Sequence, residues 1–537
     1  MKIFTLDTTL RAGALGEGVS FGTEEKLLVA QKLDELGIDY IEGGWPGAGT
    51  RDEEFFARAR AMRFQHARLT GFGSARLTRT PLEQDASIRA LLAVETPTCS
   101  LAASGWSLHV FEVLRMTEKE HLRLIAEMVG ILKAEGREVI YDAEHFFDGY
   151  YANPGFALHT LEAAKRAGAD VLSLCDSNGE SVTERLAEIC AEVRKRFDGV
   201  LGIQTYNDED LAVANTLAAI EQGFTHIQGC MNGYGERCGN ANLCSLIPDL
   251  ELKLGHTTVG RENLRRLSSV ARLVAECTSL PLRGDQPYVG RSAFTREAGM
   301  HVGVVLKDPV SSERTQPEEV GNRARVVWDD LSDTDSIFHM LGLDDLARTL
   351  TGQAQREFLD RIRQMEREGY ELETAAGTLE LLVREAVEPG LRFFEVTGFE
   401  VATGMTAERE TTTTAKVTVQ VRNASYSAAA KGNGPLNALD ECLRQALATF
   451  YPEIGGMRLT DYRVRVLEPN KGTAAKVRVS IQWSDGHKTW VTAGVSENVI
   501  EASWLALLDA IRLELMRLHE RRGTLAGATV EDYSWGV

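Results

Sequence analysis

The chain has 537 residues, of which 43% are apolar and 26% are charged, as is usual for a water-soluble globular protein. A chain of this length is expected to fold as two or three domains. Its formal net charge of -19 argues against a nucleic-acid partner and against docking on anionic membranes.

The cysteine spacing and the N-terminal residues indicate the cellular compartment in which the protein is expected. The eight cysteines are scattered and form no C-x-x-C pair, so neither a zinc knuckle nor a thiol redox motif is indicated. Residues 1–6 enter a strand-like pattern directly, without the features of a signal peptide. No apolar run approaches the length of a membrane span. We therefore expect a cytoplasmic protein that has no membrane partner.

From residue 1 to about residue 252, the chain repeats a unit of a short β-rich apolar run, a loop and an amphipathic helix. The predicted strands begin near residues 2, 39, 68, 97, 138, 171, 200 and 226. Eight strands at roughly 30-residue spacing predict an α/β fold, the (β/α)8 TIM barrel. A doubly wound open sheet is the second choice, although such sheets usually have fewer strands.

The remainder of the chain is predicted to form two further parts. Residues 253–389 are expected to be helical linker subdomains, and residues 390–537 a C-terminal α+β domain. The pattern of residues 415–421 returns at 475–481, which predicts an internal ββα repeat. The two helices are expected to open at Gly434–Pro435 and at Ser496, which is a good N-cap. Small domains of this kind more often sense a ligand or dimerise than catalyse.

In a (β/α)8 barrel the chemistry lies at the carboxyl ends of the strands. Gln204 and Tyr206 are expected to share one face of their strand, because residues two apart point the same way. Two histidines there would form the core of a metal site, whereas a neutral amide and a neutral phenol are poor ligands. A capping or loop role is the alternative for any single strand-end residue. The polar residues expected at this end are Arg11, Glu42, Glu144, His145, Asp176, Ser177, Asn178, Gln204, Tyr206, Asn207, Asn232, Glu236, Arg237 and Asn240.

Four segments in this order resemble the citramalate synthase family, which belongs with 2-isopropylmalate and homocitrate synthases. They are DTTLR at 7–11, YIEGGWPG at 40–47, YDAEHFFDG at 141–149 and NGYGERCGNAN at 232–242. The resemblance covers nearly the whole chain and includes the C-terminal repeat, which looks like the family's regulatory, amino-acid-binding domain. It implies a barrel that condenses acetyl-CoA with a 2-oxoacid, in the chemistry of branched-chain amino-acid biosynthesis, with a divalent metal holding the oxoacid.

The resemblance also implies that this chain is a divergent member with a degraded metal site. Ala12 stands where the family's Arg-Asp-Gly motif supplies the first ligand, and Gln204 and Tyr206 replace the two histidines of His-x-His-Asn-Asp. Asn240 matches the fourth ligand, but one neutral amide cannot hold a divalent ion. We therefore expect no resident cofactor and no metal. Without the ligand aspartate, Arg11 is expected to be the one strong cation of the pocket, suited to a carboxylate.

Other family positions keep their chemistry. By resemblance, Arg11 polarises a carbonyl. In a metal-independent enzyme, Glu144 or His301 would move a proton, and Tyr206 would donate a hydrogen bond to an oxyanion where the family has its metal. Ser177 replaces a threonine that binds the substrate carboxylate. The substrate-binding residues predicted on this basis are Ser177, His145, Glu236, Asn240 and Gln204.

Three hypotheses follow. The first is a metal-independent enzyme that acts on a 2-oxoacid or related carboxylate, an acyl-CoA, or both, by Claisen-type condensation, its reverse, or thioester hydrolysis. The second is a catalytically inactive member that senses an amino acid through residues 390–537 or serves as a subunit of a hetero-oligomer. The third is an active citramalate synthase with substitute metal ligands. In each case the resemblance favours a homodimer built through the C-terminal domain.

Overall fold

The computed structural model describes residues 1–75, 86–278, 280–297, 315–323, 325–327, 337–338, 341, 343, 346, 349–405, 411–486 and 488–526. These residues divide into two compact units. The first unit runs from Met1 to Thr295 and includes residues 315–323. The second contains the described residues from 349 to 526. Each unit has its own apolar core and is described by itself.

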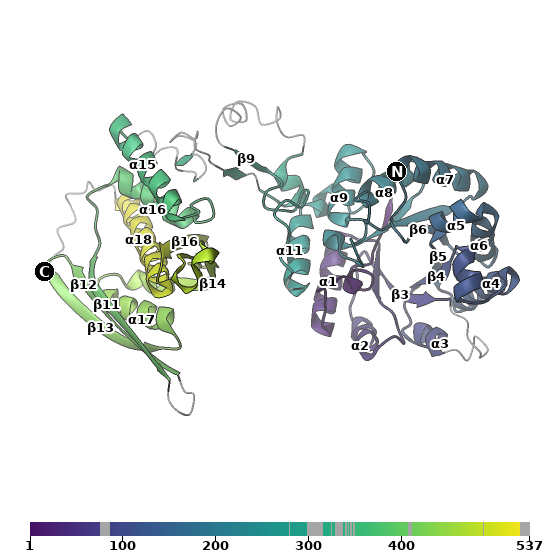
Figure 1. Ribbon diagram of the computed structural model, residues 1–537, viewed down its shortest axis with the longest axis horizontal. Helices are drawn as coiled ribbons and strands as arrows, with labels where there is room; N and C mark the ends of the chain where they lie inside the picture. The colour runs from purple at the N-terminus through teal and green to yellow at the C-terminus, as the bar shows by residue number, and fades with distance from the viewer. Residues whose placement is uncertain are drawn as a thin grey trace. The chain divides into compact units, whose positions relative to one another are not determined.

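The first unit is a closed barrel of eight parallel strands in chain order, with β8 returning to pair with β1 (Figure 1). The predicted barrel is therefore confirmed, and the open sheet is excluded. Each strand begins within two residues of its predicted start. The strands are β1 (Phe4–Asp7), β2 (Tyr40–Gly44), β3 (Arg68–Ser74), β4 (Thr98–Ser104), β5 (Glu138–Glu144), β6 (Val171–Asp176), β7 (Val200–Thr205) and β8 (His226–Gly229).

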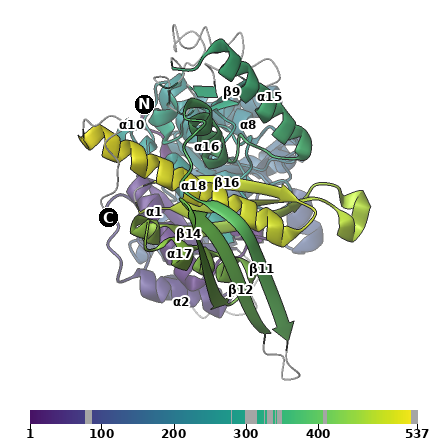
Figure 2. The ribbon, with the colours of Figure 1, turned by 90° about the vertical axis from the view of Figure 1, so that its left-hand side faces the viewer.

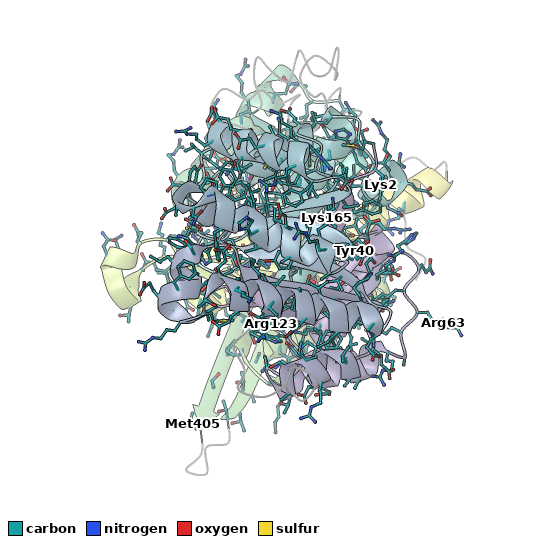
Figure 3. All side chains as sticks on the ribbon, turned by 90° about the vertical axis from the view of Figure 1, so that its right-hand side faces the viewer. Lys2, Tyr40, Arg63, Arg123, Lys165 and Met405 are labelled. Carbon is teal, nitrogen blue, oxygen red and sulfur yellow. The ribbon has the colours of Figure 1, made fainter. Side chains whose placement is uncertain are left out.

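Amphipathic helices surround the barrel, and their apolar faces pack on the strands. Arg123 on α4 and Lys165 on α6 extend from this outer layer of helices (Figure 3). Several helices end at a glycine in the left-handed conformation; helix α1, for example, ends at Gly37, whose φ is 92°. The helices are α1 (Thr23–Leu36), α2 (Thr50–Ala59), α3 (Ala86–Ala93), α4 (Glu118–Ala134), α5 (Phe146–Ala152), α6 (Pro154–Arg166), α7 (Thr183–Arg196) and α8 (Ala212–Glu221).

The remainder of the first unit follows β8. It consists of α9 (Leu243–Pro248), a π-helical turn (Asp249–Lys253), α10 (Arg261–Leu264), α11 (Leu267–Thr278) and a 3-10 turn (Pro317–Val320). The short strands β9 (Thr295–Glu297) and β10 (Arg325–Val327) pair with each other, and most residues of both belong to the second unit. Helix α11 packs against α1.

The second unit begins with α15 (Gly352–Glu368) and α16 (Ala376–Val387) and continues with two sheets, each followed by a helix. Helix α17 packs on β12 and β13, and α18 packs on β15 and β16 (Figure 2). The elements are β11 (Glu395–Met405), β12 (Thr411–Val421), β13 (Ala424–Gly432), α17 (Pro435–Leu447), β14 (Arg458–Val466), β15 (Val477–Ser484), β16 (Thr489–Ser496) and α18 (Val499–Ala526).

This unit corrects two details of the sequence prediction. Each repeat is βββα and not ββα, because β11 and β14, whose residues lie largely exposed, precede the two strands that the sequence predicted in each repeat. Helix α17 begins with Pro435 as predicted. Helix α18 begins at Val499, and its cap is Asn498, whose Oδ1 accepts a hydrogen bond from the Ile500 N–H at 2.8 Å. Ser496 instead accepts a hydrogen bond from the Asn498 N–H.

Apolar side chains fill the amino-terminal end of the barrel interior. Leu6, Tyr40, Ile140 and Val171 form one buried cluster there. Polar side chains occupy the inward positions further along the same strands, such as Asp142 and Glu144 on β5. The interior is therefore open to chemistry only at the carboxyl ends of the strands. No helix in the described part of the chain is long and apolar enough to cross a membrane.

Candidate active site

A cavity of about 320 Å³ lies at the carboxyl ends of the barrel strands. Its walls are largely polar, and Phe72 and Ala102 are the apolar side chains among the described lining residues. The full lining is Arg11, Phe72, Ala102, His109, Asp142, Glu144, His145, Ser177, Gln204, Tyr206, Glu236 and Arg237. A cavity of this size accepts a small polar molecule.

Arg11, just after β1, is fixed by two contacts. Its Nε donates a hydrogen bond to Oε2 of Glu42 on β2 at 2.6 Å. Its guanidinium lies 4.0 Å from the centre of the Phe72 ring, which is a cation–π distance. Burial opposes the charge of Arg11, but the Glu42 carboxylate outweighs it and raises the pKa of the guanidinium. The expectation that Arg11 is the one strong cation of the pocket is wrong, because Arg237 also lines the cavity. Glu42 moreover pairs with Arg11.

Asp142 on β5 lies two residues before Glu144 and shares its inward face. The Asp142 Oδ1 accepts a hydrogen bond from Gln228 Nε2 on β8 at 2.6 Å. Its Oδ2 is buried and has no hydrogen-bond partner among the described residues. Burial, and then the charge of Glu42, raise the pKa of Asp142 to about 7. Asp142 is thus half-protonated near neutrality.

Gln204 and Tyr206 both line the cavity, as their spacing predicts. Burial raises the pKa of Tyr206 to about 12, so its phenol is neutral and donates hydrogen bonds. The Arg237 guanidinium lies 4.7 Å from the centre of the Tyr206 ring and binds Asp208 through two hydrogen bonds of 2.8 Å. In the described structure, Nε2 of Gln204 is buried without a partner. The wall near Arg11 therefore presents neutral donors.

His145 and Ser177 both line the cavity and contact each other. The Ser177 Oγ accepts a hydrogen bond from the His145 N–H at 2.9 Å, which leaves the serine hydrogen free to donate elsewhere. The His109 ring packs edge-on against the His145 ring at 4.4 Å. Burial, and then the neighbouring His145, lower the pKa of His109.

The structure brings together most of the predicted site residues. Those that line the cavity are Arg11, Glu144, His145, Ser177, Gln204, Tyr206 and Glu236. Asn240 is not part of the lining. It is bridged to Tyr206 and donates through Nδ2 to the Tyr234 carbonyl at 3.3 Å. His301 lies outside the described residues.

Four lining residues were missed: Phe72, Ala102, His109 and Asp142. The rule that placed Gln204 and Tyr206 on one face would also have found Asp142, two residues before Glu144. Phe72 occupies an inward position of β3, where its ring supports Arg11. His109 lies in a π-helical turn (His109–Val113) after β4, so the alternation of a strand does not predict where its side chain points.

The four family metal positions do not fit a divalent ion. Ala12 offers no donor atom, and Tyr206 is neutral. Gln204 and Asn240 offer neutral amides, which bind Mg²⁺, Mn²⁺ or Zn²⁺ weakly without a carboxylate or imidazole beside them. Among the described residues, no group of three His, Cys, Asp or Glu side chains is placed to hold a metal ion.

Family comparisons agree with the two units. Residues 2–274 match the HMGL-like family, and residues 373–514 match the LeuA allosteric (dimerisation) domain. The fold and site thus define a barrel of the HMGL-like class that carries a LeuA-type C-terminal domain.

The chain is 43% identical to the (R)-citramalate synthase of Aquifex aeolicus over 97% of its own length and 99% of the relative's. It is 42% identical to that of Geobacter sulfurreducens over 96% and 98%. The chain belongs to the citramalate synthase and 2-isopropylmalate synthase family of acyltransferases. A solved HMG-CoA lyase of Bacillus subtilis covers 52% of this chain and 95% of its own, with 18% identity and a TM-score of 0.46.

Proposed function

We propose that this chain is a metal-independent member of its family, which binds a 2-oxoacid or related carboxylate and acts on it with an acyl-CoA as co-substrate. The observation that carries the proposal is the composition of the cavity. Residues at three family metal positions lack a ligand that holds a divalent ion, whereas Arg11, Glu144, Ser177 and Glu236 remain around the same space.

The described residues supply the interactions that such a ligand needs. Arg11 is held by Glu42 through Nε, so its two terminal nitrogens are left to bind a carboxylate or polarise a carbonyl. Tyr206 and Gln204 present neutral donors on the neighbouring wall, suited to the negative charge that develops on a carbonyl oxygen. Ser177 adds a hydroxyl. The pocket therefore replaces a bound cation with a set of fixed donors.

The second unit supports a homodimer and an amino-acid effector as further parts of the proposal. Its match to the LeuA allosteric (dimerisation) domain gives the first reason. The second is that β14 exposes four large apolar side chains, with exposures of 39% to 48% (Leu459, Tyr462, Val464 and Val466). Such a row on a sheet is suited to contact with a second copy.

Isothermal titration of the full chain with pyruvate, related 2-oxoacids and acetyl-CoA, each with and without EDTA, tests the proposal. We expect binding that EDTA does not change, and a loss of oxoacid affinity of at least about 10-fold in Arg11→Met, since a charge-assisted pair is lost. Arg123→Met is the control, because Arg123 is 72% exposed on α4.

Two results would contradict the proposal. EDTA-sensitive binding restored by one equivalent of a divalent ion would support an active synthase with substitute ligands. No binding of any oxoacid or acyl-CoA, together with binding of a branched-chain amino acid, would support a non-catalytic sensor.

A further inference from the structure

His145 has an unusual backbone at a central position. It is the residue between β5 and α5, and its φ of 53° and ψ of 35° lie in the left-handed region. Residues other than glycine rarely adopt this conformation, and those that do gather at active sites. The His145 N–H is held by Ser177 Oγ at 2.9 Å. The fold thus maintains a disfavoured backbone that places the His145 side chain at the cavity wall.

The imidazole ring of His145 is oriented by a carboxylate. Its Nδ1 lies 3.4 Å from Oδ2 of Asp148, one turn along α5. The Asp148 Oδ1 in turn accepts a hydrogen bond from Asn178 Nδ2 at 3.1 Å. Burial opposes the charge of Asp148, but hydrogen bonds from His145 and Asn178 outweigh it and lower its pKa. Asp148 is therefore ionised and selects the tautomer of His145 that has its hydrogen on Nδ1.

The remaining ring nitrogen is left for a ligand. In the described part of the chain, no residue hydrogen-bonds to Nε2 of His145. The rings of His109 and Trp106 pack against His145 at 4.4 and 5.9 Å and restrict its rotation. A histidine whose one nitrogen is held by a carboxylate while the other faces a cavity has the arrangement of a general base.

We propose that His145, oriented by Asp148, is the base that removes a proton from the carbon next to the carbonyl of the bound ligand. This inference rests on the proposed function and adds the residue that moves the proton. The proton passes to Nε2 of His145, and the electron pair of the broken C–H bond forms the C=C bond of an enolate. The carbonyl π pair moves to the oxygen, where Arg11 and Tyr206 stabilise the charge. Asp148 stabilises the imidazolium.

Exchange of the methyl protons of pyruvate with D2O, followed by NMR in the presence of EDTA, tests this step without requiring a complete turnover. We expect the full chain to accelerate exchange and His145→Gly to slow it about 100-fold or more when both are measured at saturating pyruvate. Glycine suits this variant because it adopts the positive φ of position 145 without strain. Added imidazole should restore exchange in His145→Gly, which a purely structural role would not allow.

Matched variants separate the roles. Asp148→Asn should slow exchange and retain pyruvate binding, because it removes the group that positions the ring. His159→Gln is the control, since His159 forms a similar pair with Glu118 at 2.8 Å on the outer surface. Its exchange rate should match that of the unaltered chain.

Three outcomes would overturn the inference: pyruvate bound without accelerated exchange, exchange that persists in His145→Gly, or exchange lost in Glu144→Gln while imidazole fails to rescue His145→Gly. In each of these the proposed function stands as long as pyruvate binds. Failure of pyruvate and related oxoacids to bind would instead contradict the proposed function itself.

Discussion

Replacing Asp142 by asparagine should stabilise the barrel more at pH 8 than at pH 5. Asp142 is 2% exposed, and one of its oxygens accepts a hydrogen bond from Gln228. An asparagine retains an oxygen for this bond but carries no charge. Burial and the charge of Glu42 raise the pKa of Asp142 from the ordinary value of 3.8 to about 7. Between pH 3.8 and about pH 7, the folded protein therefore binds more protons than the unfolded chain. The contribution of Asp142 to stability falls as pH rises through this window.

The size of the effect follows from linkage. One pKa unit corresponds to about 1.4 kcal/mol, so the raised pKa of Asp142 costs about 4 kcal/mol of stability at pH 8. At pH 5 it costs about 2 kcal/mol, because folding must then protonate a side chain that is ionised in the unfolded chain. Asp142→Asn removes both amounts. Its stabilisation at pH 8 should therefore exceed that at pH 5 by about 2–3 kcal/mol. This difference is independent of any pH-insensitive cost of the new amide.

The assay is urea unfolding at both pH values, read by hydrogen exchange and mass spectrometry of peptides from β5. A local readout is needed because tryptophan fluorescence would mix signals from the barrel (Trp45 and Trp106) with signals from the second unit (Trp483, Trp490 and Trp504). Asp198→Asn is the control, because the Asp198 side chain is 91% exposed, and its effect should stay within about 0.5 kcal/mol. An equal effect of Asp142→Asn at pH 5 and pH 8 would refute the reasoning.

Three further predictions concern packing, metal content and ligand binding. Gly149→Ala should destabilise the barrel by about 2 kcal/mol or more in thermal unfolding, because its Cβ would lie 2.1 Å from the Gly105 carbonyl oxygen; Gly130→Ala, with open space around its Cβ, should not. Dialysis against EDTA should leave the Tm unchanged, and a stoichiometric metal found by elemental analysis would contradict the metal-free pocket. Pyruvate affinity should rise as pH falls through about 7, where Asp142 becomes neutral, and this dependence should be absent in Asp142→Asn.

Local sequence patterns were sufficient to predict the barrel. Buried parallel strands carry continuous apolar runs, and glycines such as Gly37 and Gly168 end the preceding helices with a positive φ. The first strand of each C-terminal repeat was missed. The sequence of β14 does alternate from Tyr462 to Val466 and could have been predicted, whereas Gly398 and Gly404 interrupt the pattern of β11.

Strand geometry and the family resemblance predicted most of the lining residues but not the contacts between them. Gln204 and Tyr206 lie two apart, so their common face follows from the geometry of a strand. The ion pair between Arg11 and Glu42 joins β1 to β2, and its 2.6 Å separation depends on how the barrel closes. His145 and Asp148 are close in sequence, but the left-handed turn that separates strand from helix has no signature in residue types other than glycine.

The replacements at the metal positions form a physically consistent set. Two guanidinium groups, Arg11 and Arg237, line the cavity together with Asp142, Glu144 and Glu236, so negative charge already opposes an incoming carboxylate. An aspartate at position 12 would add to this repulsion once no cation offset it, and Ala12 removes that charge. The other two replacements exchange ligand atoms for hydrogen-bond donors on the cavity wall. Loss of ligands by random substitution does not require either outcome, whereas both favour the metal-free carboxylate pocket that we propose.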